Sequence, residues 1–269
     1  CKKRTPEELE ELKTGPICSL THFGPHVIPD IVTAGLDTVG MRCPAHELCR
    51  AVIEAAEVPV AAPSGNTSGK PSPTTARHML DDMEGKIDAI LDGGPCTVGV
   101  ESTIIDLTCT PPRLLRPGGI TLEQLEEVLG EVAVDPAVTR QMGEGERPRA
   151  PGMKYRHYAP RAPVTAVKGD PERGAAYIRD HLSHTRWDGV ICFEEFVPLF
   201  AAGPVTRPVL SLGPAADKGE QARRLFDALR AMDSTDVKRI WAQCPDDGGI
   251  GLAVANRLNK AAGFHIIEV

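Results

Sequence analysis

Apolar residues recur along the chain at two spacings, which predict a succession of β-strands and amphipathic helices. In the first part of the chain, alternating or continuous apolar runs predict strands at 38–42, 58–62, 89–92, 97–107 and 113–116. Helical spacing and N-cap residues predict helices at 5–13 and 44–56, one capped by Thr74 or Thr75, and one from the capping box of Thr121 and Gln124 to Gly130. The strand at 58–62 is expected to be buried, since nearly all its residues are apolar.

The same patterns restart near Val164. Strands are expected there at 164–167, 190–193, 209–212, 239–242 and 265–269, with helices at 171–182, 219–232 and 252–262. Residues 135–163 carry many prolines and glycines without apolar periodicity, which indicates a linker or an ordered arm. We therefore expect two α/β domains, 1–134 and 164–269, joined by an arm at 135–163.

Composition narrows the class of protein. No apolar run approaches the roughly 18 to 20 residues that a membrane-crossing helix needs, so we expect no membrane contact. The scattered cysteines and the lack of a secretion signal favour a cytoplasmic protein. A net charge of −7 argues against wholesale non-specific binding to nucleic acid and leaves a local basic groove open. The eight cysteines are scattered like reduced thiols, and the spacing of Cys43, His46 and Cys49 is wrong for a zinc knuckle. No metal site is predicted.

Three loop segments could carry chemistry. Residues 62–72 offer hydroxyls, an amide, glycine backbone and one ammonium, which can cradle phosphate oxygens or form a merely structural turn. Residues 99–103 place Glu101 and two hydroxyls inside an apolar stretch, where they need partners. Arg116 ends a strand, where its guanidinium could bind an anion or form a surface salt bridge.

These segments resemble, in order, the motifs of the YrdC family. The matching residues are 37–46, 61–75, 92–103 and 115–118, and 151–160 resembles the linker signature of the long, two-domain members. The resemblance covers about residues 28 to 269. It implies a twisted mixed-sheet YrdC-like domain followed by a smaller, Rossmann-like open α/β domain.

The resemblance implies synthesis of L-threonylcarbamoyl-AMP and pyrophosphate from L-threonine, bicarbonate or CO2, and ATP, with Mg²⁺ carried by the nucleotide. The product would pass to the tRNA threonylcarbamoyl transferase complex for modification of adenosine 37, and direct tRNA contact is left open. ATP or the adenylate would contact Thr38, Ser64, Ser72, Arg116 and Tyr155. L-threonine would be held by Arg42, Ala62 and Ser102. Further candidates in the same motifs are Asn66, Lys70, Thr103, Lys154 and His157.

Catalysis of this kind needs positioning and charge neutralisation and no covalent nucleophile. The arm around Tyr155 would fold over the site as a lid, or serve only as a tether.

The resemblance to the family is incomplete at the N-terminal end of the chain. The family's Pro-Thr-Asp/Glu-Thr-Val-Tyr-Gly loop and Lys-x-Arg motif are not recognisable, and Lys2, Lys3 and Arg4 lie too close to Arg42 to supply the latter. We expect residues 1–27 to be divergent or truncated. The alternatives are a catalytically impaired or RNA- or nucleotide-binding relative, and an enzyme that transfers the carbamoyl group to another acceptor.

Overall fold

A computed structural model describes residues 17–22, 28–33, 35–143, 157–202 and 204–269. The chain forms two compact units, each built from two stretches of sequence. Unit 1 takes residues 1–62 and 101–153, and unit 2 takes residues 63–100 and 154–269. Residues 63–100, which sequence analysis assigned to the first domain, thus belong to the same unit as the C-terminal sheet.

Unit 1 contains a mixed five-stranded sheet in the order β2-β1-β3-β4-β5. Its strands are β1 (Ile17–His22), β2 (Thr38–Met41), β3 (Thr103–Asp106), β4 (Arg113–Arg116) and β5 (Ala133–Val134). β1 pairs antiparallel with β2 and parallel with β3, and β3 pairs antiparallel with β4. Leu20, Ile104 and Leu115 form the core of this sheet together with Ala137. The mixed sheet confirms the predicted fold class.

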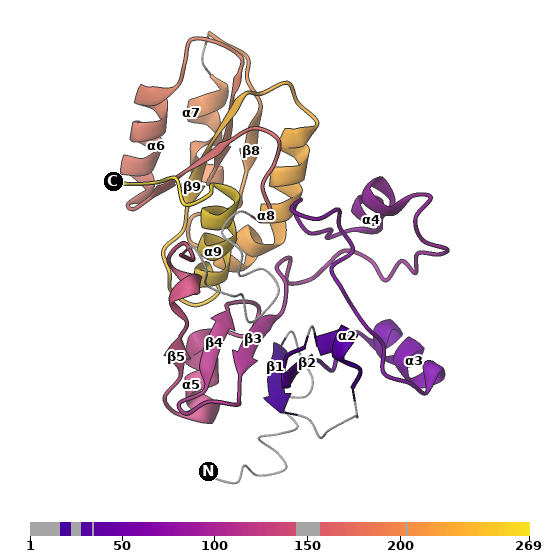
Figure 1. Ribbon diagram of the computed structural model, residues 1–269. Helices are drawn as coiled ribbons and strands as arrows, with labels where there is room; N and C mark the ends of the chain where they lie inside the picture. The colour runs from indigo at the N-terminus through magenta and orange to yellow at the C-terminus, as the bar shows by residue number, and fades with distance from the viewer. Residues whose placement is uncertain (1–16, 23–27, 34, 144–156, 203) are drawn as a thin grey trace. The chain divides into compact units, whose positions relative to one another are not determined.

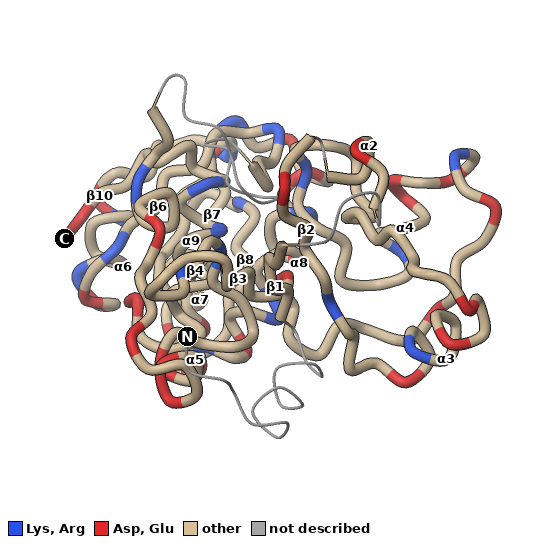
Figure 2. The backbone as a smooth tube through the Cα atoms, turned by 60° about the horizontal axis from the view of Figure 1, so that its bottom comes forward, with Lys and Arg blue, Asp and Glu red and all other residues tan. Residues whose placement is uncertain are grey.

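Three α-helices and one short 3-10 turn accompany this sheet in the described part of unit 1: α2 (Asp30–Thr33), α3 (Glu47–Ala56), α5 (Leu122–Leu129) and η1 (Pro136–Val138). The predicted capping box starts α5, because the Thr121 hydroxyl accepts from the Gln124 N–H and the Gln124 side chain accepts from the Thr121 N–H. Gly130, with φ of 76°, ends the helix as predicted. Acidic positions gather around α5, as Figure 2 shows.

Unit 2 contains a parallel five-stranded sheet in the order β10-β6-β9-β7-β8. The strands are β6 (Val164–Lys168), β7 (Asp188–Cys192), β8 (Val209–Ser211), β9 (Arg239–Cys244) and β10 (Ile266–Glu268). The helices are α4 (Ala76–Met83), α6 (Pro171–His181), α7 (Val197–Ala201), α8 (Lys218–Asp233) and α9 (Gly251–Ala261), with a 3-10 turn η2 at Glu194–Phe196. Figure 1 shows α6, α7, α8 and α9 around the sheet.

Two hydrophobic clusters sandwich this parallel sheet. One contains apolar residues of α8 and α9, such as Phe226 and Leu258, and the other contains residues of α6 and α7, such as Ile178 and Phe200. Every residue of β7 is buried, as expected for a parallel strand covered on both faces. The strands and the helices α6, α8 and α9 predicted for this half are confirmed within a few residues.

Several predictions for the first part of the chain were wrong. Residues 58–62 form no strand, and Val58 and Val60 are 59% and 51% exposed. Pro59 has no N–H to donate to a neighbouring strand, which disfavours the segment inside a sheet. Residues 89–92 form no strand, and only 103–106 of the predicted 97–107 strand pair in the sheet. Sequence analysis missed β1, α2, β5 and α7, and its helix at 5–13 lies outside the described residues. No helix among the described residues is long and apolar enough to span a bilayer.

Candidate functional site

Three predicted residues of unit 1 meet at one edge of the mixed sheet. β2 and β4 end where β3 begins, so Arg42 after β2, Arg116 at the end of β4 and Ser102 before β3 come together. Arg42 Nη1 donates to Ser102 Oγ at 3.0 Å. Arg116 donates to the Ser102 carbonyl oxygen from Nε at 3.1 Å and from Nη2 at 2.9 Å. Ser102 is therefore held by both guanidinium groups.

The electrostatic character of this cluster is cationic. Ser102 is only 6% exposed, whereas Arg42 lies open to solvent. An exposed guanidinium oriented by one hydrogen bond keeps further N–H donors for a carboxylate or phosphate. The arrangement can therefore bind an anion beside a positioned hydroxyl.

Sequence reasoning missed Cys18, which belongs to the same cluster. Burial raises the pKa of the Cys18 thiol, and the positive charges of Arg116 and Arg42 oppose that rise. The residue sits on β1, and a Cβ added at Gly40 on the neighbouring strand would lie 3.2 Å from its sulfur. Its only signal in the sequence was the short apolar pattern of β1, which is too weak to predict a strand.

The turn after Arg116 packs tightly against Ser102 and Thr103. A Cβ added at Gly118 would lie 2.3 Å from the Thr103 nitrogen and 2.5 Å from the Glu101 oxygen, so no other residue fits without a shift of backbone. Thr103 is fully buried, and its Oγ1 donates to the Ile120 carbonyl at 2.6 Å and accepts from the Ile120 N–H at 3.0 Å. The Pro-Gly-Gly turn after Arg116 thus packs against the backbone of residues 101–103 and fixes the position of Ser102.

The predicted ligand loop lies in unit 2 and has its own hydrogen bonds. Asn66 donates from Nδ2 to the carbonyls of Thr67 at 2.9 Å and Lys70 at 3.1 Å, which closes the loop on itself. Asn66 Oδ1 is buried without a hydrogen-bond partner among the described residues. Ser72 is buried, whereas Ser64 is exposed. The loop is therefore an ordered turn with outward and inward polar groups.

Two residues that sequence reasoning missed anchor this loop. Asp82 on α4 accepts from the Thr67 N–H at 3.1 Å and pairs with Arg230 of α8 at 2.8 Å. Burial opposes ionisation of Asp82, but hydrogen bonds from Arg230 and Thr67 and the charge of Lys70 hold its pKa below the ordinary value. The partners are 148 positions apart, so no local pattern could have revealed them.

The other predicted residues lie in varied places. Thr38 begins β2 opposite His22, half-buried, and Ala62 is exposed in the connection before the loop. His157 packs edge-on against Tyr158 with ring centroids 4.1 Å apart. Lys154 and Tyr155 lie outside the described residues.

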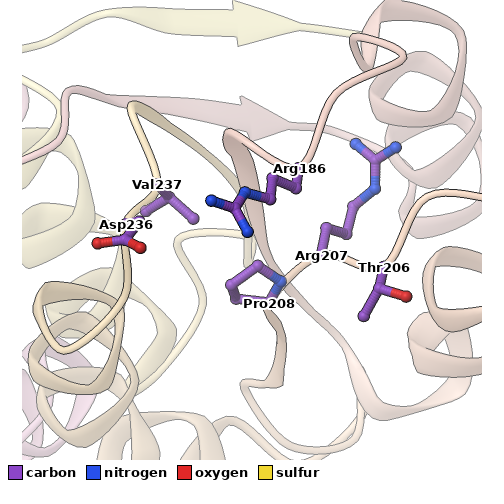
Figure 3. Close-up of a pocket in the computed structure, with 6 residues that line it drawn as sticks. All are labelled: Arg186, Thr206, Arg207, Pro208, Asp236 and Val237. Carbon is purple, nitrogen blue, oxygen red and sulfur yellow. The ribbon is translucent and has the colours of Figure 1, made fainter.

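A cavity of about 290 Å³ opens elsewhere, at the amino ends of β7 and β8. Its lining residues are Arg186, Thr206, Arg207, Pro208, Asp236 and Val237, labelled in Figure 3, and no predicted site residue is among them. Among the described residues, no group of three or more His, Cys, Asp or Glu side chains could hold a metal ion.

Comparison with known proteins connects both units to one family. The family model for the threonylcarbamoyl-AMP synthase C-terminal domain matches residues 120–263, and a model described as telomere recombination matches residues 2–118. The matched region begins earlier than residue 28, where the predicted resemblance started.

Individual relatives agree with the family models. The chain is 46% identical to threonylcarbamoyl-AMP synthase of Pyrococcus abyssi over 272 aligned positions, covering 99% of this chain and 77% of the relative. It is 45% identical to the Bacillus subtilis protein of the same name, covering 91% of this chain and 68% of the relative. The crystal structure of P. abyssi Sua5 complexed with L-threonine superposes with a TM-score of 0.82 at 43% identity, covering 99% of this chain and 77% of that one. The chain belongs to the threonylcarbamoyl-AMP synthase family, in its two-domain form.

Proposed function

We propose that this protein makes L-threonylcarbamoyl-AMP and pyrophosphate from L-threonine, bicarbonate or CO2, and ATP. The observation that carries the proposal is the convergence of Arg42 and Arg116 on Ser102 in a chain of this family. ATP, the carbamate and the adenylate product are anions and threonine carries a carboxylate, and a fixed cluster of guanidinium groups suits such ligands.

L-threonine would bind at the exposed face of Arg42. The guanidinium can form a two-pronged pair with the amino-acid carboxylate while its Nη1 stays on Ser102 Oγ. Ser102 can offer its hydroxyl to the substrate, and Ala62 contributes backbone groups. The P. abyssi structure with bound L-threonine supports this choice of substrate.

The nucleotide would contact residues from several of the motif segments. Thr38, Ser64, Ser72 and Tyr155 are the proposed hydroxyl contacts, and Lys70 supplies an ammonium that is partly exposed. Arg116 donates from Nε and Nη2 to the Ser102 carbonyl, which fixes its guanidinium beside Ser102 as a cationic group that suits a phosphate.

The chemistry follows from these positions. The neutral threonine amine attacks the carbon of CO2, which bicarbonate and a proton supply by loss of water, and the nitrogen releases a proton to solvent to give the carbamate. A carbamate oxygen then attacks the α-phosphorus of ATP, and the bond from that phosphorus to the oxygen bridging the β-phosphate breaks, so that pyrophosphate leaves with the bridging oxygen. The residues bind and align the anions and neutralise developing charge, which is sufficient for such a displacement.

Mg²⁺ would arrive with the triphosphate and neutralise part of its charge, because this ion commonly binds through substrate phosphates and few protein groups. The protein's own contribution is to hold the nucleotide through the groups named above. The product would serve N6-threonylcarbamoyladenosine formation at tRNA position 37 in the cytoplasm, through the transferase complex.

Pyrophosphate release tests the proposal. The full chain with ATP, bicarbonate and magnesium should release pyrophosphate only when L-threonine is added, and mass spectrometry should detect threonylcarbamoyl-AMP. Serine and valine test the choice of amino acid, and EDTA tests the metal. Release that does not depend on any amino acid, or binding of tRNA without release, would refute the proposed activity.

A further inference from the structure

Residues 63–100 belong to the same unit as α8, the helix that follows β8 and precedes β9 in the chain and lies beside the C-terminal sheet (Figure 1). Gly99 shows how closely the segment approaches, since a Cβ added there would lie 2.3 Å from the Ala222 oxygen and from the Arg223 Cα. Val100 at the end of the segment belongs to the hydrophobic cluster that contains Phe226 of α8. The segment that carries the ligand loop therefore packs against α8 at its C-terminal end.

Arg230 makes the most specific contact between that helix and the ligand loop. Its Nη2 donates to the Pro71 carbonyl at 2.6 Å and to Asp82 Oδ2 at 2.8 Å, and its Nε lies 3.4 Å from the Ser72 carbonyl. The side chain is 13% exposed, so these bonds are largely shielded from water. One guanidinium thus holds the carbonyl groups of two consecutive peptide units, the one before Ser72 and the one after it.

Asp82 holds the opposite side of the same loop. Its side chain is 2% exposed, and it accepts from the Thr67 N–H at 3.1 Å with Lys70 Nζ at 3.8 Å. A buried carboxylate needs such partners, because an unpaired charge away from water is strongly unfavourable. Asp82 and Arg230 therefore fix the middle of the loop at Thr67 and its end at Pro71 and Ser72.

A second pair ties α4 to α8 one turn away. His78 Nε2 lies 3.3 Å from Asp227 Oδ1, while His78 Nδ1 accepts from the Thr74 N–H at 3.2 Å. Nδ1 is thus an acceptor, so the proton of the neutral ring is on Nε2 and faces Asp227. The two ties make rotation of α4 on α8 unfavourable.

We propose that Arg230 and Asp82 are positioning residues for the nucleotide, through which the C-terminal domain sets the conformation of the 63–73 ligand loop. The proposal rests on the proposed function of that loop as an ATP-binding element. Neither residue needs to contact ATP, since both act on the loop backbone. The C-terminal domain gains a role in nucleotide affinity that the resemblance to the family did not assign.

Loss of Arg230 has a direct physical consequence for the loop. The Pro71 and Ser72 carbonyls lose their donor, and the buried Asp82 carboxylate loses its main counter-charge. Displacement of a binding group by about 1 Å can cost up to about 100-fold in rate or affinity. Arg230→Met should therefore weaken ATP binding by about 10-fold to 100-fold. Arg230→Lys keeps the charge but loses the planar, two-pronged donor geometry, so its ATP affinity should lie between those of the wild type and Arg230→Met.

The chain offers a matched control in the same unit. Asp188, whose side chain is 4% exposed, pairs with Arg239 at 2.8 Å and accepts from the Ser183 N–H at 2.7 Å. Asp188→Asn should therefore destabilise the fold about as much as Asp82→Asn, although Asp188 touches no part of the ligand loop. All variants are compared at a temperature where each is folded.

The experiment measures ATP and threonine KM in the pyrophosphate assay, binding of a non-hydrolysable ATP analogue by calorimetry, and hydrogen exchange of residues 63–73. We expect Arg230→Met and Asp82→Asn to raise the ATP KM and the analogue Kd, leave the threonine KM unchanged and speed exchange in the loop. Asp188→Asn should change none of these. Equal losses of ATP affinity in Asp82→Asn and Asp188→Asn, or wild-type values in Arg230→Met, would overturn the proposal.

Failure of the proposed function gives a different result. If the wild-type chain releases no pyrophosphate with threonine, the activity is wrong, yet analogue binding and loop exchange still decide the role of Arg230. If the wild-type chain does not bind the analogue at all, the positioning role is overturned as well.

Discussion

Arg42 Nη1 donates a hydrogen bond to Ser102 Oγ although the two residues are 60 positions apart in the sequence. The bond joins the end of β2 to the start of β3 across β1, which lies between these strands in the sheet. It orients an exposed guanidinium beside a buried hydroxyl. Substrate affinity should therefore depend on the shape of this guanidinium as well as on its charge.

Arg42→Lys tests that dependence. An ammonium cannot bond Ser102 and both oxygens of a carboxylate in one plane, so the threonine KM should rise by about 10-fold to 100-fold while the ATP KM stays within about twofold. Initial rates of pyrophosphate release measure both constants. Arg50→Lys is the control, since Arg50 only pairs loosely with Glu54 at 3.9 Å on α3. Equal rises in both KM values would count against the assignment.

Gly118→Ala should destabilise unit 1. The added methyl would lie 2.3 Å from the Thr103 nitrogen, and overpacking of this kind typically costs about 1 to 3 kcal/mol. Urea denaturation followed by circular dichroism measures the loss. Gly174→Ala is the control, because its new Cβ would have no neighbour closer than 3.5 Å and alanine favours the helix in which it lies. An unchanged midpoint for Gly118→Ala would show that the turn can move.

Asp82 should make stability depend on acid pH. The folded-state pKa lies below the ordinary 3.8, so the stabilisation is complete above that value and is lost as pH falls through the folded pKa. Asp82→Asn should lower the free energy of unfolding by about 1.5 to 3 kcal/mol at pH 7, the usual worth of a hydrogen bond to a charged group. The difference from wild type should shrink below pH 3.8. Denaturation curves at several pH values measure it, and a constant difference would contradict the pairing.

Buried thiols should resist alkylation. Burial raises the pKa of Cys192 and of Cys244 to about 12, so both stay protonated at pH 8 and are shielded from reagents. Cys43 and Cys49 are exposed. Iodoacetamide treatment of the folded protein followed by peptide mapping should label Cys43 and Cys49 but leave Cys192 and Cys244 unmodified until urea is added. Early labelling of Cys192 would mean that β7 opens readily.

Local signals in the sequence were enough to predict the helices that begin with a capping residue and the strands of the parallel sheet. Thr121 with Gln124 and Thr75 at the start of α4 act through bonds within one turn, so their pattern is complete in a few residues. The strands of unit 2 are buried on both faces and therefore appear as apolar runs.

The remaining elements depend on contacts with residues that are distant in the sequence, which a local pattern cannot reveal. Val58 to Ala62 has the composition of a buried strand but lies in an exposed connection, since composition cannot tell whether a neighbouring strand exists. Asp82 is one of several charged residues on a short helix, and nothing nearby distinguishes it from a solvated carboxylate. The motif residues of the predicted site were assigned from resemblance and stay a prediction, whereas the residues that support them became visible only in the three-dimensional structure.

The grouping of residues 63–100 with the C-terminal sheet has a consequence for engineering and divergence of this family. A chimera that exchanges the C-terminal domain at residue 164 would place a foreign α8 under α4, and its activity would depend on whether the new helix offers a cation at the position of Arg230 and an acceptor at that of Asp227. The two stretches should therefore be inherited together. Substitutions on α8 should be accompanied by compensating changes on α4, even though the two helices are separated by more than a hundred residues of chain.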